Sequence, residues 1–241
     1  MFKVRAASDR GVARFDWLDS RHSFSFGHYY DPQQMGFGVL RVINEDKINP
    51  GQGFGMHSHQ DMEIITYVLE GALEHQDSLG NRSVIRAGDV QRMTAGTGIR
   101  HSEFNASTQE RVHLLQIWIL PDTTGLPPGY EEIHLEVQGE NQSPLRLIGS
   151  RQEQREGVTT PQVTIHQDVN LYVARLNPEQ DLTYPIGAER SLWLQVSQGD
   201  LEINDRPITV GDGVGITEMG EITLKGLSEG AEALLFDLPS L

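Results

Sequence analysis

Two short segments carry metal-ligand side chains at a spacing of two residues: His57-Ser58-His59 and His101-Ser102-Glu103. On an extended strand, residues i and i+2 point to the same face and lie roughly 6.5–7 Å apart along the backbone. If the two segments pair as neighbouring strands, three imidazoles and one carboxylate converge on one point. Three nitrogen ligands and one oxygen ligand suit Fe, Mn, Ni, Co or Cu. The spacing therefore predicts a single metal site.

Short runs of β-branched and apolar residues surround these segments and indicate an all-β chain. Between Phe37 and Leu120 the runs alternate with Gly, Asn and Asp, a pattern typical of an antiparallel sandwich or barrel. The strands expected in this half are Gly38–Ile43, Glu63–Leu69, Ala72–Gln76, Ser83–Arg86, Val90–Thr94 and Val112–Leu120.

The composition changes after Leu120. Residues 121–129 are rich in Pro and Gly, which break helices and strands alike, and a short helical turn is expected over Tyr130–Val137. We therefore expect two domains, residues 1–125 with the metal site and residues 126–241 without one. The strands expected in the second domain are Gln162–His166, Leu171–Leu176, Leu192–Val196, Asp200–Ile203, Ile208–Val210 and Ala233–Leu238.

The second series of strands weakly repeats the first. Val68–Glu74 (VLEGALE) aligns with Val196–Glu202 (VSQGDLE), and Gly88-Asp89 aligns with Gly211-Asp212. Such a repeat indicates a duplicated β-barrel unit. Transferring the offsets of the four candidate ligands to the second copy leads to side chains that cannot replace an imidazole: Pro185, Gly187, Leu224 and Gly226. We expect this copy to lack a metal site.

Composition narrows the classes of partner. The formal net charge is −15, from 34 acidic and 19 basic residues, whereas nucleic-acid binding draws on clustered Lys and Arg. Direct nucleic-acid binding is therefore not expected. The absence of cysteine suits a reducing compartment, and no apolar run approaches the ~20 residues of a membrane span. We expect a cytoplasmic protein with no membrane partner.

The two histidine-containing segments also allow an interpretation without a metal. A single His-x-His pair is about as often an exposed polar strand as a ligand pair. Glycine-rich stretches precede His57 and His101 and favour the metal site, because glycine allows close backbone approach. The identity of the acid stays open on spacing alone, since Glu63 and Glu103 both have the parity to face the histidines.

Other conspicuous side chains receive structural interpretations. Six further histidines are expected to be surface or hydrogen-bonded core residues: His22, His28, His75, His113, His134 and His166. An aromatic cluster is expected to pack across the barrel mouth rather than stack on a substrate: Phe24, Phe26, Tyr29 and Tyr30.

Longer stretches around these motifs resemble the pirin family: Arg14–Pro32, Met35–Asp46 and Met93–Glu103. The likeness covers nearly the whole chain and departs at Gln60-Asp61-Met62, where many relatives carry an arginine and a glycine. It implies two tandem cupin domains, each a jelly-roll β-barrel, with a metal in the first only. It also implies a ligand set of His57, His59, His101 and Glu103, with Glu63 as a supporting acid.

Four protein ligands on a metal that prefers five or six leave a position for water, dioxygen or a substrate oxygen. The pirin resemblance implies an enzyme similar to quercetin 2,3-dioxygenase, which opens the central ring of flavonols with O2 and releases carbon monoxide. Glu103 would then also act as the general base for the 3-hydroxyl of the substrate. Fe(II) is the expected metal, with Mn, Ni, Co, Cu and Zn as alternatives.

The competing hypothesis is a metal- or redox-sensing regulatory protein of the pirin type that binds a protein partner. The acidic charge is compatible with such a partner, but no run resembles a basic nuclear-localisation signal. A third interpretation is an isomerase or another non-oxidative cupin enzyme, because fold and ligands do not determine the reaction.

Overall fold

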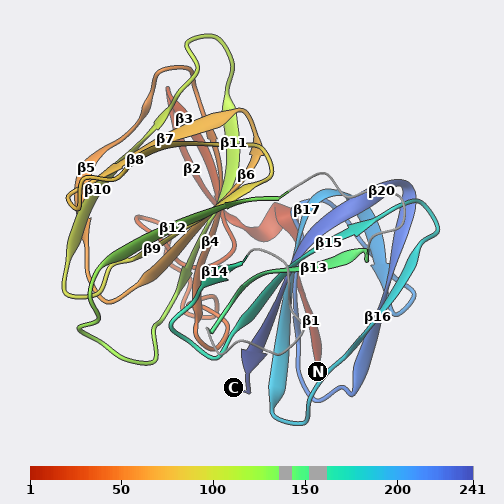
Figure 1. Ribbon diagram of the computed structural model, residues 1–241. Coiled ribbons are helices and arrows are strands. Elements are labelled where there is room, and N and C mark those ends of the chain that lie inside the picture. Colours follow the sequence, from red (N-terminus) through yellow and green to blue (C-terminus); the bar gives the residue numbers. More distant parts are fainter. Residues whose placement is uncertain (136–142, 152–161, 241) are drawn as a thin grey trace. The chain divides into compact units, whose positions relative to one another are not determined.

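Strands account for nearly all regular structure in the computed structural model, which describes residues 1–135, 143–151 and 162–240 (Figure 1). Two compact units divide the chain. The N-terminal unit comprises residues 11–135 and 163–167, and the C-terminal unit comprises residues 1–10, 143–151, 162 and 168–240. The expected all-β architecture is confirmed. None of the helices in the described residues has both the length and the apolar character to cross a bilayer.

The N-terminal unit contains two antiparallel sheets, ordered β12-β9-β6-β11-β4-β3-β2 and β5-β10-β7-β8. The larger sheet comprises β2 (Gly11–Phe15), β3 (Leu18–His22), β4 (Leu40–Ile48), β6 (Glu63–Glu70), β9 (Asp89–Thr94), β11 (Val112–Ile119) and β12 (Gly129–His134). The smaller sheet comprises β5 (Gly53–His59), β7 (Ala72–Asp77), β8 (Arg82–Arg86) and β10 (Ile99–Asn105). The short strand β14 (Val163–Thr164) contacts β9 and β12.

Strand β10 shows how the sequence determines the inward face. Burial alternates along it, so that His101, Glu103 and Asn105 are buried while Phe104 is exposed. This period of two follows from strand geometry. Polar side chains therefore occupy inward positions on β10, and each of them needs hydrogen-bond partners or a ligand inside the unit.

Two apolar clusters join the sheets of the N-terminal unit. Each contains residues from both sheets, and burying a Leu or Ile side chain stabilises the fold by roughly 1.5–3 kcal/mol. These clusters hold the smaller sheet, and with it β5 and β10, against the larger one. The first consists of Leu18, Ile48, Val68, Leu73, Ile85, Val112 and Leu114, and the second of Ile64, Met93, Ala95 and Ile99.

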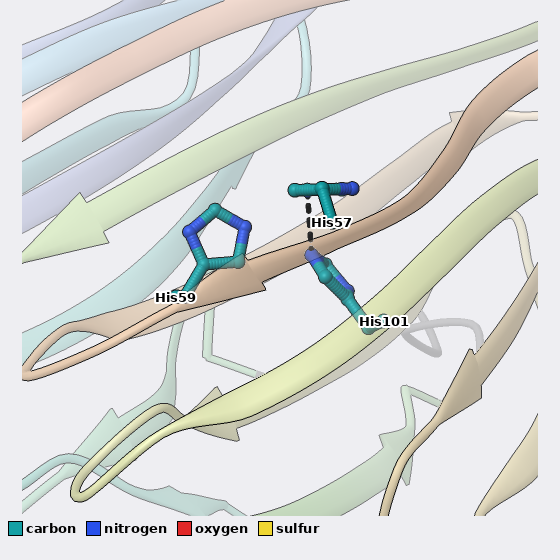
Figure 2. A group of neighbouring side chains, drawn as sticks. All are labelled: His57, His59 and His101. Atoms are coloured by element: carbon teal, nitrogen blue, oxygen red, sulfur yellow. Dashed lines mark hydrogen bonds between the residues drawn. The ribbon is translucent and has the colours of Figure 1, made fainter.

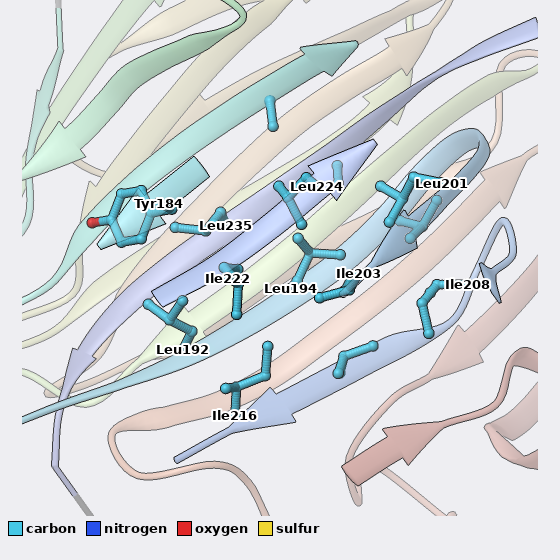
Figure 3. Packing of buried hydrophobic residues seen from close by; sticks show 14 of the residues in the cluster. Tyr184, Leu192, Leu194, Leu201, Ile203, Ile208, Ile216, Ile222, Leu224 and Leu235 are labelled. Carbon is cyan, nitrogen blue, oxygen red and sulfur yellow. The ribbon is translucent and has the colours of Figure 1, made fainter. Parts of the chain in front are cut away.

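The C-terminal unit is built on a sheet ordered β1-β19-β17-β20-β15-β13, with β16 paired to β20 and β18 paired to β17. Its strands are β1 (Phe2–Arg5), β13 (Leu145–Ser150), β15 (Asn170–Leu176), β16 (Asp181–Pro185), β17 (Arg190–Ile203), β18 (Arg206–Ile208), β19 (Gly213–Ile216) and β20 (Glu221–Pro239), and a 3-10 turn, η1, spans Ala7–Asp9. Leu, Ile, Val and Ala side chains dominate its core (Figure 3). Within the described residues, both groups of His and Glu side chains close enough to share an ion lie in the N-terminal unit.

The sequence repeat corresponds to matching backbone turns. Gly71 and Gly199 have φ of +77° and +62°, and a Cβ on either would lie 2.7 Å or 2.1 Å, respectively, from a backbone oxygen. Gly88 and Gly211 have φ of +85° and +86°. Only glycine adopts such conformations without strain. The weak repeat thus marks positions where both units impose the same backbone requirement.

One sequence expectation differs from the structure near the middle of the chain. The helical turn expected over Tyr130–Val137 is wrong for the described residues, because they belong to strand β12 up to His134. This strand pairs antiparallel with β9, from Gly129 opposite Thr94 to His134 opposite Asp89. Residues 136 and 137 lie outside the described residues.

The grouping of contacts also differs in detail from a single cut after residue 125. Strand β1 pairs with β19, which brings residues 1–10 into the C-terminal unit, and β12 pairs with β9, which keeps residues 126–135 in the N-terminal unit. The domain boundary between residues 125 and 126 stays a prediction from the sequence.

Candidate metal centre

Strands β5 and β10 pair antiparallel and bring the three candidate histidines together. His101 lies opposite His57 in the ladder, and Ile99 lies opposite His59. Ring centroids are 4.4 Å apart for His57 and His101, 4.7 Å for His57 and His59, and 4.9 Å for His59 and His101. Figure 2 shows the three rings gathered where the two strands run side by side. The spacing predicted this arrangement, and the role of the rings as metal ligands stays a proposal.

A glycine permits the close approach of the two strands. A Cβ on Gly53 would lie 2.1 Å from the backbone oxygen of Glu103 and 2.6 Å from the Cα of Phe104. The register of the ladder shifts between His101 and Glu103. Such a bulge redirects side chains, and bulges are frequent next to active sites. The glycine-rich stretch before His57 therefore has the structural purpose that the sequence suggested.

The proton on His57 is assigned by its backbone partner. Nδ1 of His57 lies 2.8 Å from the carbonyl oxygen of Gly55 and donates to it. This leaves a lone pair on Nε2, which lies 3.0 Å from Nε2 of His101. Metal-binding histidines commonly donate their second ring nitrogen in this way, which orients the ligating nitrogen.

Burial keeps two of the imidazoles neutral. It lowers the pKa of His101 to about 3, with the neighbouring His57 and His75 as further causes. It also lowers the pKa of His59 to about 4, followed by the effects of His101 and His57. Neutral imidazole is the form that binds a metal. In addition, Nδ1 of His101 is buried with no hydrogen-bond partner among the described residues. This donor set fits a transition metal.

Glu103 is held by two donors from the larger sheet. Its side chain is 2% exposed, Gln116 Nε2 donates to Oε2 at 2.7 Å, and the hydroxyl of Thr66 donates to Oε1 at 3.4 Å. The indole of Trp118 in turn donates to Oε1 of Gln116 at 3.3 Å, which orients the amide.

The carboxylate of Glu103 lies beside the histidine triad rather than within it. His57, His59 and His101 form one group whose ligand atoms lie within 4.8 Å of one another, and His75, His101 and Glu103 form a second such group. His101 belongs to both groups. The four predicted residues are therefore brought into one region, with His101 linking the acid to the other two imidazoles.

Gln116 and Thr66 belong to a row of polar side chains that crosses the larger sheet. The row reaches the smaller sheet through hydrogen bonds to Glu103 and, from Gln91, to His75. Its members are direct cross-strand neighbours on β3, β4, β11, β6 and β9, in the order His22, Asn44, Gln116, Thr66 and Gln91.

Two other candidate groups have structural partners. His75 contacts Gln91 through Nδ1 at 3.1 Å and Asp77 through Nε2 at 3.2 Å, so it is a hydrogen-bonded core histidine, as interpreted from the sequence. Glu63 is fully buried and contacts His166 Nδ1 at 3.2 Å. Among the described residues it belongs to neither group of candidate ligands. Glu103 is thus the acid that accompanies the triad.

A cavity of about 780 Å³ opens onto His57, His59 and Glu103. Trp118 packs edge-on against His59 at 5.0 Å and against Phe26 at 5.3 Å between ring centroids. The size and aromatic character of the cavity suit a planar aromatic ligand. Its aromatic lining consists of Phe15, Trp17, Phe26, Tyr29, Phe54 and Trp118.

The four aromatic residues expected to pack across the barrel mouth lie in different surroundings. Phe26 and Tyr29 line the cavity, whereas Phe24 is buried in the core and Tyr30 is 71% exposed. Whether any of them stacks on a substrate stays a prediction. The arrangement could not be read from the sequence because the four residues lie outside regular alternation.

Sequence reasoning also missed a buried acid in the cavity wall. Asp46 lies on β4 and is 3% exposed. Burial raises its pKa to about 7, a hydrogen bond from Ser20 acts in the opposite direction, and the charges of Glu103 and Glu45 raise it further. A signal was present, since Asn44 and Asp46 stand two residues apart on a strand whose other buried side chains are all apolar.

Comparison with known proteins identifies the family. The pirin family model matches residues 3–119, and the model for a quercetinase C-terminal cupin domain matches residues 147–238. A quercetin 2,3-dioxygenase of Escherichia coli is 48% identical over 240 residues, which is 99% of both chains. The chain belongs to the pirin family. Its two tandem cupin domains, expected from the resemblance, are confirmed.

Solved and curated pirins extend the comparison. The crystal structure of the bacterial pirin YhhW of Escherichia coli in complex with nickel(II) has a TM-score of 0.92 and 48% identity, and the match covers 100% of both chains. A putative quercetin 2,3-dioxygenase of Pasteurella multocida is 44% identical over 243 residues, covering 99% of this chain and 100% of the relative. The first of these relatives is a pirin that binds a transition metal.

Proposed function

We propose that this pirin is a metal-dependent dioxygenase that opens the central ring of flavonols such as quercetin with O2 and releases carbon monoxide. One observation carries the proposal: a cluster of imidazoles with a buried carboxylate beside it faces a cavity of about 780 Å³ with aromatic walls. Relatives that are 48% and 44% identical over nearly the whole chain carry the name quercetin 2,3-dioxygenase or putative quercetin 2,3-dioxygenase, which supports it.

His57, His59, His101 and Glu103 are the residues proposed to hold the metal. The neutral imidazoles and the hydrogen-bonded carboxylate supply nitrogen and oxygen donors, and no thiolate competes because the chain has no cysteine. Fe(II) is our proposal for the metal, and the nickel(II) complex of YhhW makes Ni the first alternative. When bound, such an ion would supply Lewis acidity and redox chemistry at an open coordination position.

Residues of the chain itself would bind and deprotonate the substrate. Trp118, Phe26 and the other aromatic walls would hold the flat ring system and exclude water. Glu103 would accept the proton of the flavonol 3-hydroxyl, since its carboxylate lies at the cavity beside His101. Gln116 would keep that carboxylate oriented through the 2.7 Å hydrogen bond.

The regulatory alternative is not favoured, because the curated relatives described above are named as dioxygenases. A flavonol and O2 are the proposed partners, with no nucleic acid among them. The cytoplasmic location is likewise a proposal, supported by the lack of cysteine.

The test uses protein stripped of metal and reconstituted with Fe(II) or with Ni(II). Loss of quercetin absorbance is followed in air and under anaerobic conditions, for the wild-type protein and for His59→Ala. We expect turnover only with metal and only in air, and its loss in the folded variant. Anaerobic turnover would indicate a non-oxidative cupin enzyme, and no turnover at full metal occupancy would overturn the flavonol proposal.

A further inference from the structure

The polar side chains of the cavity that lie away from the histidine triad gather on one wall. Ser20 and His22 on β3 pair across the ladder with Asp46 and Asn44 on β4, and all four line the cavity. They form two adjacent cross-strand rows on the same face, because positions two apart on a strand share a face. A polar wall therefore stands inside a cavity whose other lining is largely aromatic or apolar.

Most of the hydrogen-bonding capacity of this wall is already used. His22 Nδ1 lies 2.7 Å from Oδ1 of Asn44, so these two side chains contact each other. Asp46 differs from them. It is 3% exposed, and its Oδ1 has no hydrogen-bond partner among the described residues. An unpaired buried carboxyl oxygen is costly, and a ligand that donates a hydrogen bond to this carboxyl would reduce that cost.

The surroundings of Asp46 select the chemistry of such a ligand. Among the described residues, no Lys or Arg lines the cavity, whereas Asp46 and Glu103 both line it. Carboxyl groups with no basic side chain beside them disfavour anionic ligands such as carboxylates or phosphates on this wall. A neutral hydroxyl is a donor that suits the site.

Aromatic rings connect this wall to the metal-proximal end of the cavity. His22 lies 5.5 Å from Phe26 between centroids, Phe26 lies 5.3 Å from Trp118, and Trp118 lies 5.0 Å from His59. A flat ligand that lies along these rings would reach from the histidines to the wall that contains Asp46. Those of its hydroxyl groups that lie beside β3 and β4 would then be the available donors.

We propose that Ser20, His22, Asn44 and Asp46 form the subsite for the peripheral hydroxyl groups of a polyphenolic substrate, with the Asp46 carboxyl as the acceptor. This inference rests on the proposed function for the identity of the substrate. It assigns Asp46 as a specificity-determining residue, which distinguishes hydroxylated flavonols from less hydroxylated ones.

The test is a double-mutant-type cycle of binding measurements, in which one hydroxyl of the ligand and the side chain of Asp46 are removed separately and together. Metal-loaded protein is kept anaerobic so that no substrate is consumed. Dissociation constants are measured by quenching of tryptophan fluorescence, since Trp17 and Trp118 line the cavity. The ligands are quercetin, kaempferol, galangin and fisetin, which retain the 3-hydroxyl and differ in other hydroxyls. The variants are Asp46→Ala and Asp46→Asn, with Asp19→Asn on the same sheet as a matched control outside the cavity lining.

In the wild-type protein and in Asp19→Asn, removal of the hydroxyl that donates a hydrogen bond to Asp46 should weaken binding about 3- to 10-fold, the effect of losing one hydrogen bond. In Asp46→Ala the same removal should change affinity less than twofold, and Asp46→Asn should lie between. If Asp46→Ala does not fold, Asp46→Asn alone decides. Equal discrimination between the ligands in the wild-type protein and in the folded Asp46 variants would overturn the proposal.

Oxygen uptake separates this inference from the proposed function. If discrimination depends on Asp46 while quercetin is never oxidised, the subsite stands and the dioxygenase proposal fails. If quercetin is oxidised but discrimination is the same in every variant, the dioxygenase proposal stands and the subsite is wrong.

Discussion

Replacing Gln116 by Leu should weaken metal binding although all four proposed ligands are retained. Gln116 Nε2 donates to Glu103 Oε2 at 2.7 Å, whereas the hydroxyl of Thr66 donates to Glu103 Oε1 over a longer distance, 3.4 Å. A hydrogen bond to a charged group contributes about 1.5–3 kcal/mol, which corresponds to roughly 10- to 150-fold in a binding constant. Supporting residues of metal sites typically cost 10- to 100-fold when removed. We therefore expect a loss of about 10- to 100-fold in metal affinity.

The assay is competition for Fe(II) or Ni(II) against a chromophoric chelator, with circular dichroism as the check on folding. Trp118→Phe removes the 3.3 Å donor to Gln116 but keeps an aromatic ring beside His59 and Phe26, so it should cost less, on the order of 2- to 10-fold. Gln109→Leu changes an exposed glutamine in a loop and serves as the matched control, with no effect expected. A folded Gln116→Leu protein that binds metal within threefold of the wild-type affinity would refute the reasoning.

Three further predictions follow from the same geometry. Glu103→Gln should retain much of the metal, measured by elemental analysis, while turnover of quercetin falls at least 100-fold because the base is lost; unchanged turnover would exclude the base role. Gly53→Ala should lower both thermal stability and metal affinity, because its Cβ would lie 2.1 Å from the backbone oxygen of Glu103 and would force β5 away from β10; a wild-type melting temperature would contradict this. In the metal-free folded protein, the pKa of His59 is lowered from 6.5 to about 4 and that of His101 from 6.5 to about 3. Below pH 6.5 these two histidines therefore bind more protons in the unfolded chain than in the folded protein. Their contribution to the free energy of unfolding should fall as the pH drops from about 6.5 toward 4. Asp46, whose pKa is raised to about 7, acts in the opposite direction in this range, so urea unfolding between pH 7 and pH 5 is compared in the wild-type protein and in His101→Asn. The slope should be smaller in His101→Asn; equal slopes would show that His101 is not held neutral.

The histidine cluster could be predicted because its determinants are local. The i, i+2 spacing of His57 and His59, and of His101 and Glu103, fixes the shared face on each strand regardless of the rest of the fold. One non-local assumption was needed, that the two segments pair, and the ladder between β5 and β10 confirms it.

The support of the site could not be predicted because it depends on pairings between distant strands. Gln116, Thr66 and Asn44 lie on three different strands, and they become one row only when β11, β6 and β4 are placed in register. The same holds for Asp46, whose significance comes from its position in the cavity wall.

Long and interrupted strands show a second limit. The strand expected over Ala233–Leu238 covers only the last part of β20 (Glu221–Pro239). Gly226 and Gly230 precede it, and glycine within a sequence usually weakens a predicted strand. In the structure β20 continues through them, since its two halves pair with β16 and β15 and both pair with β17. Gly230 has φ of +76°, a local irregularity that does not end the strand.

The most direct test of the central claim is a simultaneous measurement of oxygen uptake and carbon monoxide release by the metal-loaded protein with quercetin. Opening of the flavonol ring inserts both atoms of O2 and expels one ring carbon with its oxygen. We predict that one O2 is consumed and one carbon monoxide is released for each quercetin lost. The folded His59→Ala protein should neither consume O2 nor release carbon monoxide. Oxygen uptake without carbon monoxide, or equal rates in the variant, would contradict a dioxygenase built on this histidine cluster.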